Sequence, residues 1–148
     1  EENVNMTDTY YRLSDVVVVR AGDERFKSVD DLRDNVVGVQ MGSASEQIAD
    51  KMEGLKEVRR FNYNPEAFLD LQNKRIDALI VGYAYAVNQI RTTSGDFHIL
   101  GEVGEPSEIV MVLKKDSSSL TDALNAALKE LRESGKYDEI LKKWLAAE

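Results

Sequence analysis

Cysteine is absent from this 148-residue sequence, and histidine occurs once. Without cysteine the chain can form no disulfide, no thiolate zinc site and no thiol nucleophile, and a Ser-His-Asp triad would have to use His98. His98 has no second histidine and no obvious carboxylate partner, which favours an ordinary surface or core residue over a general base. These absences exclude most nucleophilic and metal chemistry, and we expect a binding protein rather than an enzyme, with no catalytic residue, no metal ligand and no cofactor.

Basic clusters and long apolar runs are also missing. Lysine and arginine number 19 against 27 acidic residues, which gives a formal charge of −8 and predicts that nucleic acid is repelled. The longest uncharged apolar stretch, residues 78–87, is about half of what a membrane-spanning helix needs. The chain begins with Glu1 and shows no apolar signal segment, so we expect a processed mature chain or an excised piece.

What is present is the composition of a soluble, folded protein, with strands and helices alternating along the chain. Strands are predicted at residues 16–20, 36–40, 58–61, 76–81, 97–100 and 109–113. Helices are predicted after the Ser28 cap, from the small residues 41–46 to Gly54, after the Asn64 cap with Pro65 in first position, and at residues 83–92. This alternation indicates an α/β fold with a mainly parallel sheet and helices on both faces.

Two further helices are predicted at the C-terminal end, and both carry an apolar stripe. The stripe consists of Leu120, Leu124, Leu128, Leu131, Ile140 and Trp144. Five or six such side chains left in water would form a large exposed patch, so we expect a contact that covers them. Three alternatives for this contact stay open. The helices fold back onto the sheet, two chains cover each other in a homodimer, or another chain covers the helices.

Two turns are candidates for ligand binding, because ligands of parallel α/β sheets bind beyond the carboxyl ends of the strands. After the second strand, Gly42, Ser43, Ala44 and Ser45 lead into a helix with small side chains and free backbone N–H groups, which suits a carboxylate or phosphate. Gly82 and Tyr83 follow the fourth strand in the equivalent position. Gln40 and Met41 lie at the end of the second strand, next to the first of these turns.

The sequence resembles the polar amino-acid-binding family of extracytoplasmic solute-binding proteins, the receptors of ABC importers. The resemblance covers essentially the whole chain and depends on the order and spacing of five motifs. They are Tyr10-Tyr11 before the valine strand, Ser28-Val29-Asp30-Asp31-Leu32, Val36-Val37-Gly38-Val39-Gln40 with Gly42-Ser43, Arg75-Ile76-Asp77-Ala78-Leu79-Ile80, and the closing segment 127–144 that ends at Lys143-Trp144.

The resemblance implies two α/β lobes that are joined by two hinge strands and close on a ligand. By this comparison residues 1–15 are a hinge crossing with a remnant of the first lobe, residues 16–108 the complete second lobe, and residues 109–148 the second crossing with the C-terminal helices of the first lobe. The N-terminal part of the first lobe, which in the family carries the arginine for the ligand carboxylate, is missing. The chain alone is therefore expected to offer half a cleft and low affinity. Gln40 and Met41 lie where side chains of the family touch the variable end of the ligand, so the resemblance implies that both face it.

Three positions depart from the family pattern. The family has an aspartate that accepts the ligand ammonium directly after the Asp77-Ala78 strand, and here that position is Gly82. The usual Gly-Thr-Thr turn is Gly42-Ser43-Ala44, and the common Tyr-Gly of the second crossing is Glu108-Ile109. Loss of one charge-assisted hydrogen bond, about 1.5–3 kcal/mol, would weaken binding of an amino acid by one to two decades unless Glu105 or Glu108 substitutes for it.

The leading hypothesis is a receptor for a small polar ligand such as an amino acid, located in the periplasm or outside the cell, with the membrane permease of an ABC importer as partner. The alternative is an interaction module that no longer binds solute and associates with itself through the apolar stripe. A minor alternative is a dehydratase-like enzyme, because a few relatives of this fold catalyse such reactions, yet no positioned acid–base pair is evident.

Overall fold

The computed structural model describes residues 3–93 and 95–146, so the outermost residues of the predicted regions 1–15 and 109–148 lie outside the description. The chain divides into two compact units. Of the described residues, unit 1 comprises 3–13 and 106–146, and unit 2 comprises 14–93 and 95–105. The chain passes between the units twice, once within β2 (Tyr11–Arg20) and once within β6 (Phe97–Ile109).

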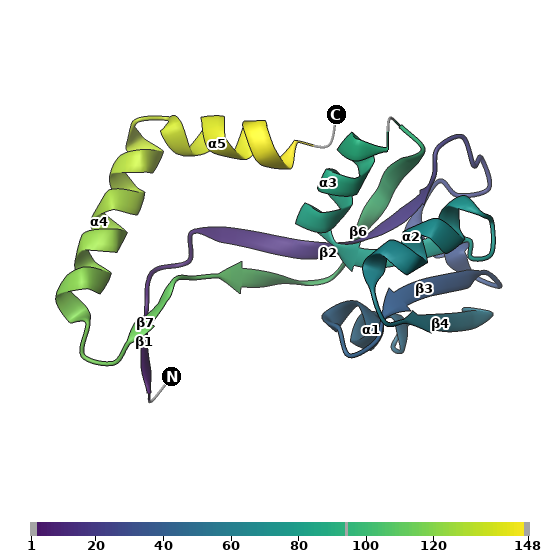
Figure 1. Cartoon of the computed structure of the whole chain (residues 1–148), viewed down its shortest axis with the longest axis horizontal. Coiled ribbons are helices and arrows are strands. Elements are labelled where there is room, and N and C mark those ends of the chain that lie inside the picture. Colours follow the sequence, from purple (N-terminus) through teal and green to yellow (C-terminus); the bar gives the residue numbers. More distant parts are fainter. Residues whose placement is uncertain (1–2, 94, 147–148) are drawn as a thin grey trace. The chain divides into compact units, whose positions relative to one another are not determined.

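Unit 2 is built on a five-stranded sheet with the strand order β4-β3-β5-β2-β6. In this sheet β3 (Val36–Gln40) runs parallel to both β4 (Glu57–Phe61) and β5 (Ala78–Gly82), whereas β2 runs antiparallel to β5. Figure 1 shows β3 and β4 side by side next to α1 and α2. The predicted α/β class with a mainly parallel sheet is confirmed, and the antiparallel β2 makes the sheet a mixed one.

The core of unit 2 lies on both faces of the sheet. Val16 and Val18 pack with side chains of α2 (Asn64–Gln72) and α3 (Tyr83–Thr92). The alternating residues Val17 and Val19 pack on the opposite face with Leu32 of η1 (Val29–Leu32) and Ala49 of α1 (Ala44–Ala49). All four valines are fully buried, as expected for a strand that is covered on both faces. The prediction of helices on both faces is therefore confirmed.

Several predicted boundaries are wrong. The strand predicted at 16–20 begins at Tyr11, because its polar first half continues the same extended chain toward unit 1. The strand predicted at 97–100 continues to Ile109 as the long β6, and the strand predicted at 109–113 is replaced by the end of β6 and the short β7 (Val112–Lys114). Periodicity of apolar residues reports burial, and these exposed or half-buried segments carry little of it.

Helix ends also differ from the predictions. The helix expected to reach Gly54 ends at Ala49, and Met52 packs against the core from the turn that follows. Asn64 is the first residue of α2 rather than its cap, since Tyr63 has the extended backbone that precedes the helix. The strand expected at 76–81 begins at Ala78, because the backbone of Ile76 and Asp77 makes other hydrogen bonds.

Unit 1 consists of a two-stranded sheet and two helices. β1 (Val4–Met6) pairs antiparallel with β7, and α4 (Ser118–Glu133) contacts β1 and α5 (Lys136–Leu145). Gly135 separates the helices with a left-handed backbone, φ 75°, which glycine adopts without a steric penalty. The Tyr137 hydroxyl donates a hydrogen bond to the carbonyl of Tyr10. No residue of α4 or α5 is buried.

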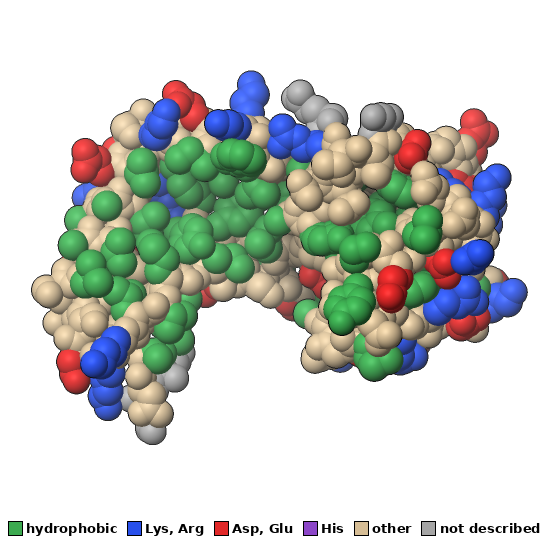
Figure 2. Space-filling model, viewed as in Figure 1, with side chains coloured by type: hydrophobic (Ala, Val, Ile, Leu, Met, Phe, Trp, Pro, Cys, Tyr) green, Lys and Arg blue, Asp and Glu red, His purple; other side chains and the backbone are tan. Residues whose placement is uncertain are grey.

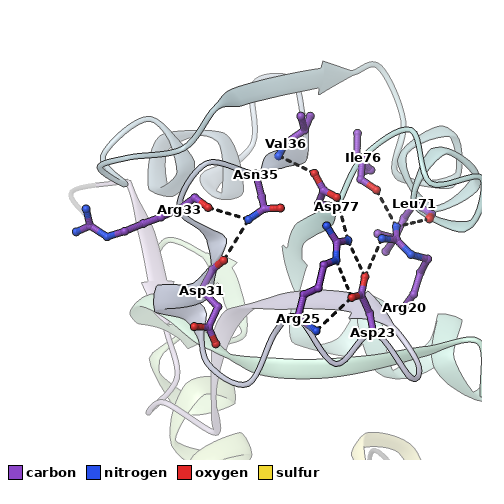
Figure 3. Close-up of polar contacts among 10 residues, drawn as sticks. All are labelled: Arg20, Asp23, Arg25, Asp31, Arg33, Asn35, Val36, Leu71, Ile76 and Asp77. Carbon is purple, nitrogen blue, oxygen red and sulfur yellow. Dashed lines mark hydrogen bonds and ion pairs between the residues drawn. The ribbon is translucent and has the colours of Figure 1, made fainter.

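A group of charged side chains joins the strand ends at the edge of the sheet where β3 and β5 begin (Figure 3). Arg20, at the end of β2, donates to the carbonyls of Leu71 and Ile76, both at 2.8 Å, and pairs with Asp23 at 2.9 Å. Arg25 binds Asp23 at 2.8 Å and Asp77 at 3.1 Å. We call Arg20, Asp23, Arg25 and Asp77 the strand-end cluster.

Because of the strand-end cluster, we expect the free energy of unfolding to depend on pH in the acid range. Hydrogen bonds from Arg25, followed by its charge and by Arg20, lower the pKa of Asp23 from 3.8 to about 2, although burial acts in the opposite direction. Because the folded-state pKa is the lower one, this stabilisation is complete above about pH 4 and is lost as the pH falls toward 2. We expect Asp23→Asn to destabilise the chain at pH 6 and to have much less effect near pH 2, as measured by urea unfolding.

The control for this prediction is Glu24→Gln, which removes a neighbouring exposed carboxylate that makes no hydrogen bond in the described structure. Its stability should follow that of the wild type at both pH values. A constant difference between wild type and Asp23→Asn from pH 6 to pH 2 would contradict the assigned role of Asp23.

Gly104 and Gly22 allow backbone strain to be separated from packing. Both have a left-handed backbone, with φ of 73° and 76°. A Cβ at Gly104 would lie 2.5 Å from Ile48 Cδ1, whereas one at Gly22 would have no heavy atom within 4 Å. We expect Gly22→Ala to cost about 1 kcal/mol through strain alone, and Gly104→Ala about 2 kcal/mol. Equal losses in chemical unfolding would show that α1 moves away from β6 without cost.

Candidate functional site

The predicted site residues gather at the opposite edge of the sheet from the strand-end cluster. β3 ends at Gln40 and β5 ends at Gly82, and these neighbouring strands run in the same direction with Val37 beside Ala78. The turn after β3 leads into α1, and α3 begins with Tyr83 directly after β5. The structure therefore brings the two predicted turns to one edge, which is where parallel α/β sheets bind ligands.

The turn after β3 is fixed by its own side chains. Gly42 has a φ of 73°, which explains the glycine at this position. Ser43 caps α1, because its hydroxyl accepts a hydrogen bond from the Glu46 amide at 3.2 Å and donates to the Gln40 carbonyl at 2.7 Å. The Ser43 amide donates to the same carbonyl at 3.3 Å. The cap sets the direction in which the following amides point.

Two of the four amides that were expected to be free are engaged. The Gly42 amide donates to the Glu46 carboxylate at 2.6 Å, and Arg60 pairs with the same carboxylate. The Gly42 hydrogen bond, and then Arg60, hold the pKa of Glu46 below its ordinary value, so this carboxylate is charged at neutral pH. The amides of Ala44 and Ser45 have no acceptor among the described residues. An anion from outside would meet these two donors.

Side chains around the turn differ in exposure. Met41 is 57% exposed, and Gln40, Gly82 and Tyr83 are half-buried. Ser45 is buried, and its hydroxyl donates to Asp15 Oδ2 at 2.6 Å. Asp15 was not among the predicted site residues. It could have been suspected only as the polar residue that precedes four valines, because its pairing with Gly82 is a matter of strand register.

The other candidates from the sequence lie elsewhere. Glu108 pairs with Arg12 at 2.8 Å, and both side chains are more than half exposed. Glu105 and His98 are exposed. Within residues 3–93 and 95–146, no group of three or more His, Asp or Glu side chains is arranged to hold a metal ion. No helix in the same residues is both long enough and apolar enough to cross a bilayer.

The comparisons with known proteins agree with this fold. The family of bacterial extracellular solute-binding proteins, family 3, matches residues 1–147. The chain therefore belongs to this family, whose members bind solutes and are not enzymes, and the predicted family is confirmed.

Individual relatives are amino-acid-binding proteins. The L-cystine-binding protein TcyJ of Escherichia coli K12 is 29% identical over 143 residues, which are 95% of this chain and 53% of the relative. The arginine-binding extracellular protein ArtP of Bacillus subtilis 168 is 29% identical over 153 residues, which are 100% of this chain and 59% of the relative. The chain thus spans little more than half the length of these curated relatives.

Solved structures match over nearly the whole chain. An ancestral cationic amino acid solute-binding protein is 27% identical with a TM-score of 0.84, covering 98% of this chain and 63% of that one. An ancestral arginine-binding protein bound to arginine is 34% identical with a TM-score of 0.69, covering 97% of this chain and 65% of that one.

Proposed function

We propose that the chain is part of a receptor that binds an amino acid or a similar small carboxylate at the edge where β3 and β5 end. The proposed ligand-binding residues are Gln40, Met41, Gly42, Ser43, Ala44, Ser45, Gly82 and Tyr83. The family and its cystine-, arginine- and glutamine-binding members support a ligand of this chemical class. By the same kinship the receptor acts in the periplasm or outside the cell and delivers its ligand to the permease of an ABC importer.

One observation carries the proposal. Ala44 and Ser45 present adjacent amides without acceptors among the described residues, at the carboxyl edge of β3 and beside the end of β5. Two neighbouring N–H groups suit the two oxygens of a carboxylate, and bonds to a charged acceptor are stronger than neutral ones. Glu46 is fixed by Gly42 and Arg60 and therefore leaves this pair of amides open.

Binding to the isolated chain should be weak, because one edge of a sheet encloses a small ligand only partly. We expect dissociation constants on the order of 1 mM for L-arginine or L-glutamine. Titration followed by amide chemical shifts should locate the changes at Ala44, Ser45 and Gly82. Sub-micromolar binding to the monomeric chain would show that the site is already complete.

Ala44→Pro tests the amide directly. Ala44 is the first residue of α1, where proline is well tolerated, and the preceding Ser43 has the extended backbone that proline requires, with ψ at 166°. The variant removes one N–H donor and should weaken carboxylate binding about tenfold while thermal unfolding stays unchanged. Ala44→Gly keeps the donor and serves as the control. Undiminished binding by Ala44→Pro would exclude the turn as the carboxylate site.

Self-association is a second candidate function, and the exposed apolar stripe of unit 1 favours it. Leu120, Leu131, Ile140 and Trp144 are between 36% and 62% exposed, and Leu124 and Leu128 are half-buried. Figure 2 shows hydrophobic side chains gathered over the unit that carries α4 and α5. Patches of this kind mark interaction sites in soluble proteins. We propose a second copy of the chain as the partner.

Light scattering at several protein concentrations tests this second candidate. The wild-type chain should show the mass of a dimer, and Ile140→Ser combined with Trp144→Ser should shift it to the mass of a monomer. Leu69→Ser is the control, because Leu69 is 55% exposed but belongs to α2 in unit 2. A wild-type chain that remains monomeric at every concentration would refute self-association.

A further inference from the structure

Asp15 is a half-buried carboxylate, and among the described residues only one of its two oxygens accepts a hydrogen bond. It lies on β2 at the edge of the sheet that carries the proposed site, and the register pairs it with Gly82 of β5. Its Oδ2 accepts the hydrogen bond from Ser45 at 2.6 Å. No described residue donates a hydrogen bond to its Oδ1. The buried serine thus fixes the carboxylate in place and leaves the other oxygen available.

The available oxygen faces the space that Gly82 leaves open. A Cβ at position 82 would lie 3.8 Å from Asp15 Oδ1, and no other heavy atom beyond the chain neighbours lies within 4 Å of it. The φ of Gly82 is −57°, a value that any residue adopts, so the backbone does not require glycine here. The missing side chain therefore matters through the room that it leaves beside Asp15.

The chemistry of this gap is complementary to a cation. A carboxylate oxygen accepts hydrogen bonds from an ammonium group at about 2.7–2.9 Å. The unoccupied space beside Gly82 is where such a group would approach Oδ1. The turn that holds Ser45 also presents the open amides of Ala44 and Ser45. One short segment thus supplies donors for an anion and, through Asp15, an acceptor for a cation, which is the pattern that a zwitterion requires.

We infer that Asp15 receives the ammonium group of the bound amino acid, in the gap beside Gly82, with Ser45 as the residue that positions the carboxylate. The inference depends on the proposed function, because it names the group that recognises one end of that ligand. It assigns to β2 a specificity-determining residue beyond those predicted from the sequence.

Other carboxylates near this part of unit 2 are already engaged. Glu46 accepts from Gly42 and pairs with Arg60. Glu102 accepts a hydrogen bond from the Ser14 hydroxyl at 3.0 Å. Because Ser14 and Asp15 are consecutive residues of β2, their side chains point to opposite faces of the strand. Asp15 is therefore the acid that combines a fixed position with an unused oxygen at the open gap.

The test compares each amino acid with the same molecule lacking its amine. L-Arginine is paired with 5-guanidinopentanoate and L-glutamine with 5-amino-5-oxopentanoate, and binding is followed by the amide shifts of the full 148-residue chain. In the wild type the amino acid should bind at least about tenfold more tightly than its partner. In Asp15→Asn, which keeps the shape and an acceptor for Ser45, this ratio should fall to nearly one, with binding of the amine-free partner unchanged.

Gly82→Ala is the second variant, because its methyl group would fill the gap at an ordinary contact distance. It should lower the ratio as Asp15→Asn does, whereas the control Asp30→Asn, an exposed acid of η1, should leave it unchanged. A ratio that survives in Asp15→Asn overturns the inference while the proposed function stands.

A separate probe covers the case in which no amino acid binds, which would refute the proposed function itself. Methylammonium chloride is then titrated while the side-chain carboxyl carbons are observed. A larger shift at Asp15 than at Asp30 supports the ammonium site, and a weaker effect in Gly82→Ala would place the cation in the gap. Equal shifts at the two carboxyls overturn the inference.

Discussion

Arg20→Met is expected to lower the free energy of unfolding by about 3 kcal/mol, since removing one member of a buried ion pair leaves its partners without compensation. The Arg20 side chain is only 14% exposed, and it satisfies Asp23 together with the carbonyls of Leu71 and Ile76. Methionine fills a similar volume without donating a hydrogen bond. Urea unfolding monitored by circular dichroism measures the loss.

Arg12→Met is the matched control for Arg20→Met. Arg12 also forms an ion pair with a carboxylate at 2.8 Å, but its side chain is 69% exposed and that of Glu108 is 55% exposed. Solvent screens such a pair, so the loss should stay below about 1 kcal/mol. If the two substitutions were equally costly, burial and the two carbonyl bonds would not explain the importance of Arg20.

Leu79→Ala should destabilise unit 2 by about 2–5 kcal/mol, because it removes a fully buried side chain from the centre of the sheet. Leu79 lies on β5 between β3 and β2, beside Gly38 and Val18. The side chain lies between two hydrogen-bonded strands, so the surrounding atoms can move little to fill the cavity that the substitution leaves. Thermal and urea unfolding of the variant provide the measurement.

Leu69→Ala provides the comparison for this second prediction. The residue type is the same, but Leu69 is 55% exposed on α2 and should cost no more than about 0.5 kcal/mol. A loss at Leu79 as small as that at Leu69 would mean that the core around β5 repacks without a cavity.

The parts of the fold that were predictable from the sequence are those with a local signal. Four successive valines indicated a strand covered on both faces, and the bounds predicted for β3 and α3 agree with the structure. The signals for these elements, apolar spacing and flanking glycines, lie within the elements or a few residues from their ends. By contrast, β6 continues through Gly104 and Pro106 over exposed residues, where local patterns argue for a break.

The candidate site was predictable to the level of its turns but not of its contacts. Gly42-Ser43 and Gly82-Tyr83 were recognisable because each follows an apolar strand. The engagement of the Gly42 amide by Glu46 and the pairing of Asp15 with Gly82 were not, since they depend on side-chain direction and on a register between residues 67 positions apart, Asp15 and Gly82. Register is set by the packing of the whole sheet.

The strand-end cluster and the predicted site residues lie at opposite ends of β3 and β5. The arginines and aspartates of the cluster bind at the edge where β3 and β5 begin, and the Gln40, Met41 and Gly82 positions lie where these strands end. Met41 is exposed, and neither Met41 nor Gly82 contributes a side chain to the core. Substitutions at Met41 and Gly82 should therefore change the surface at one end of the strands with little loss of stability, whereas substitutions of the paired charges at the other end should be costly.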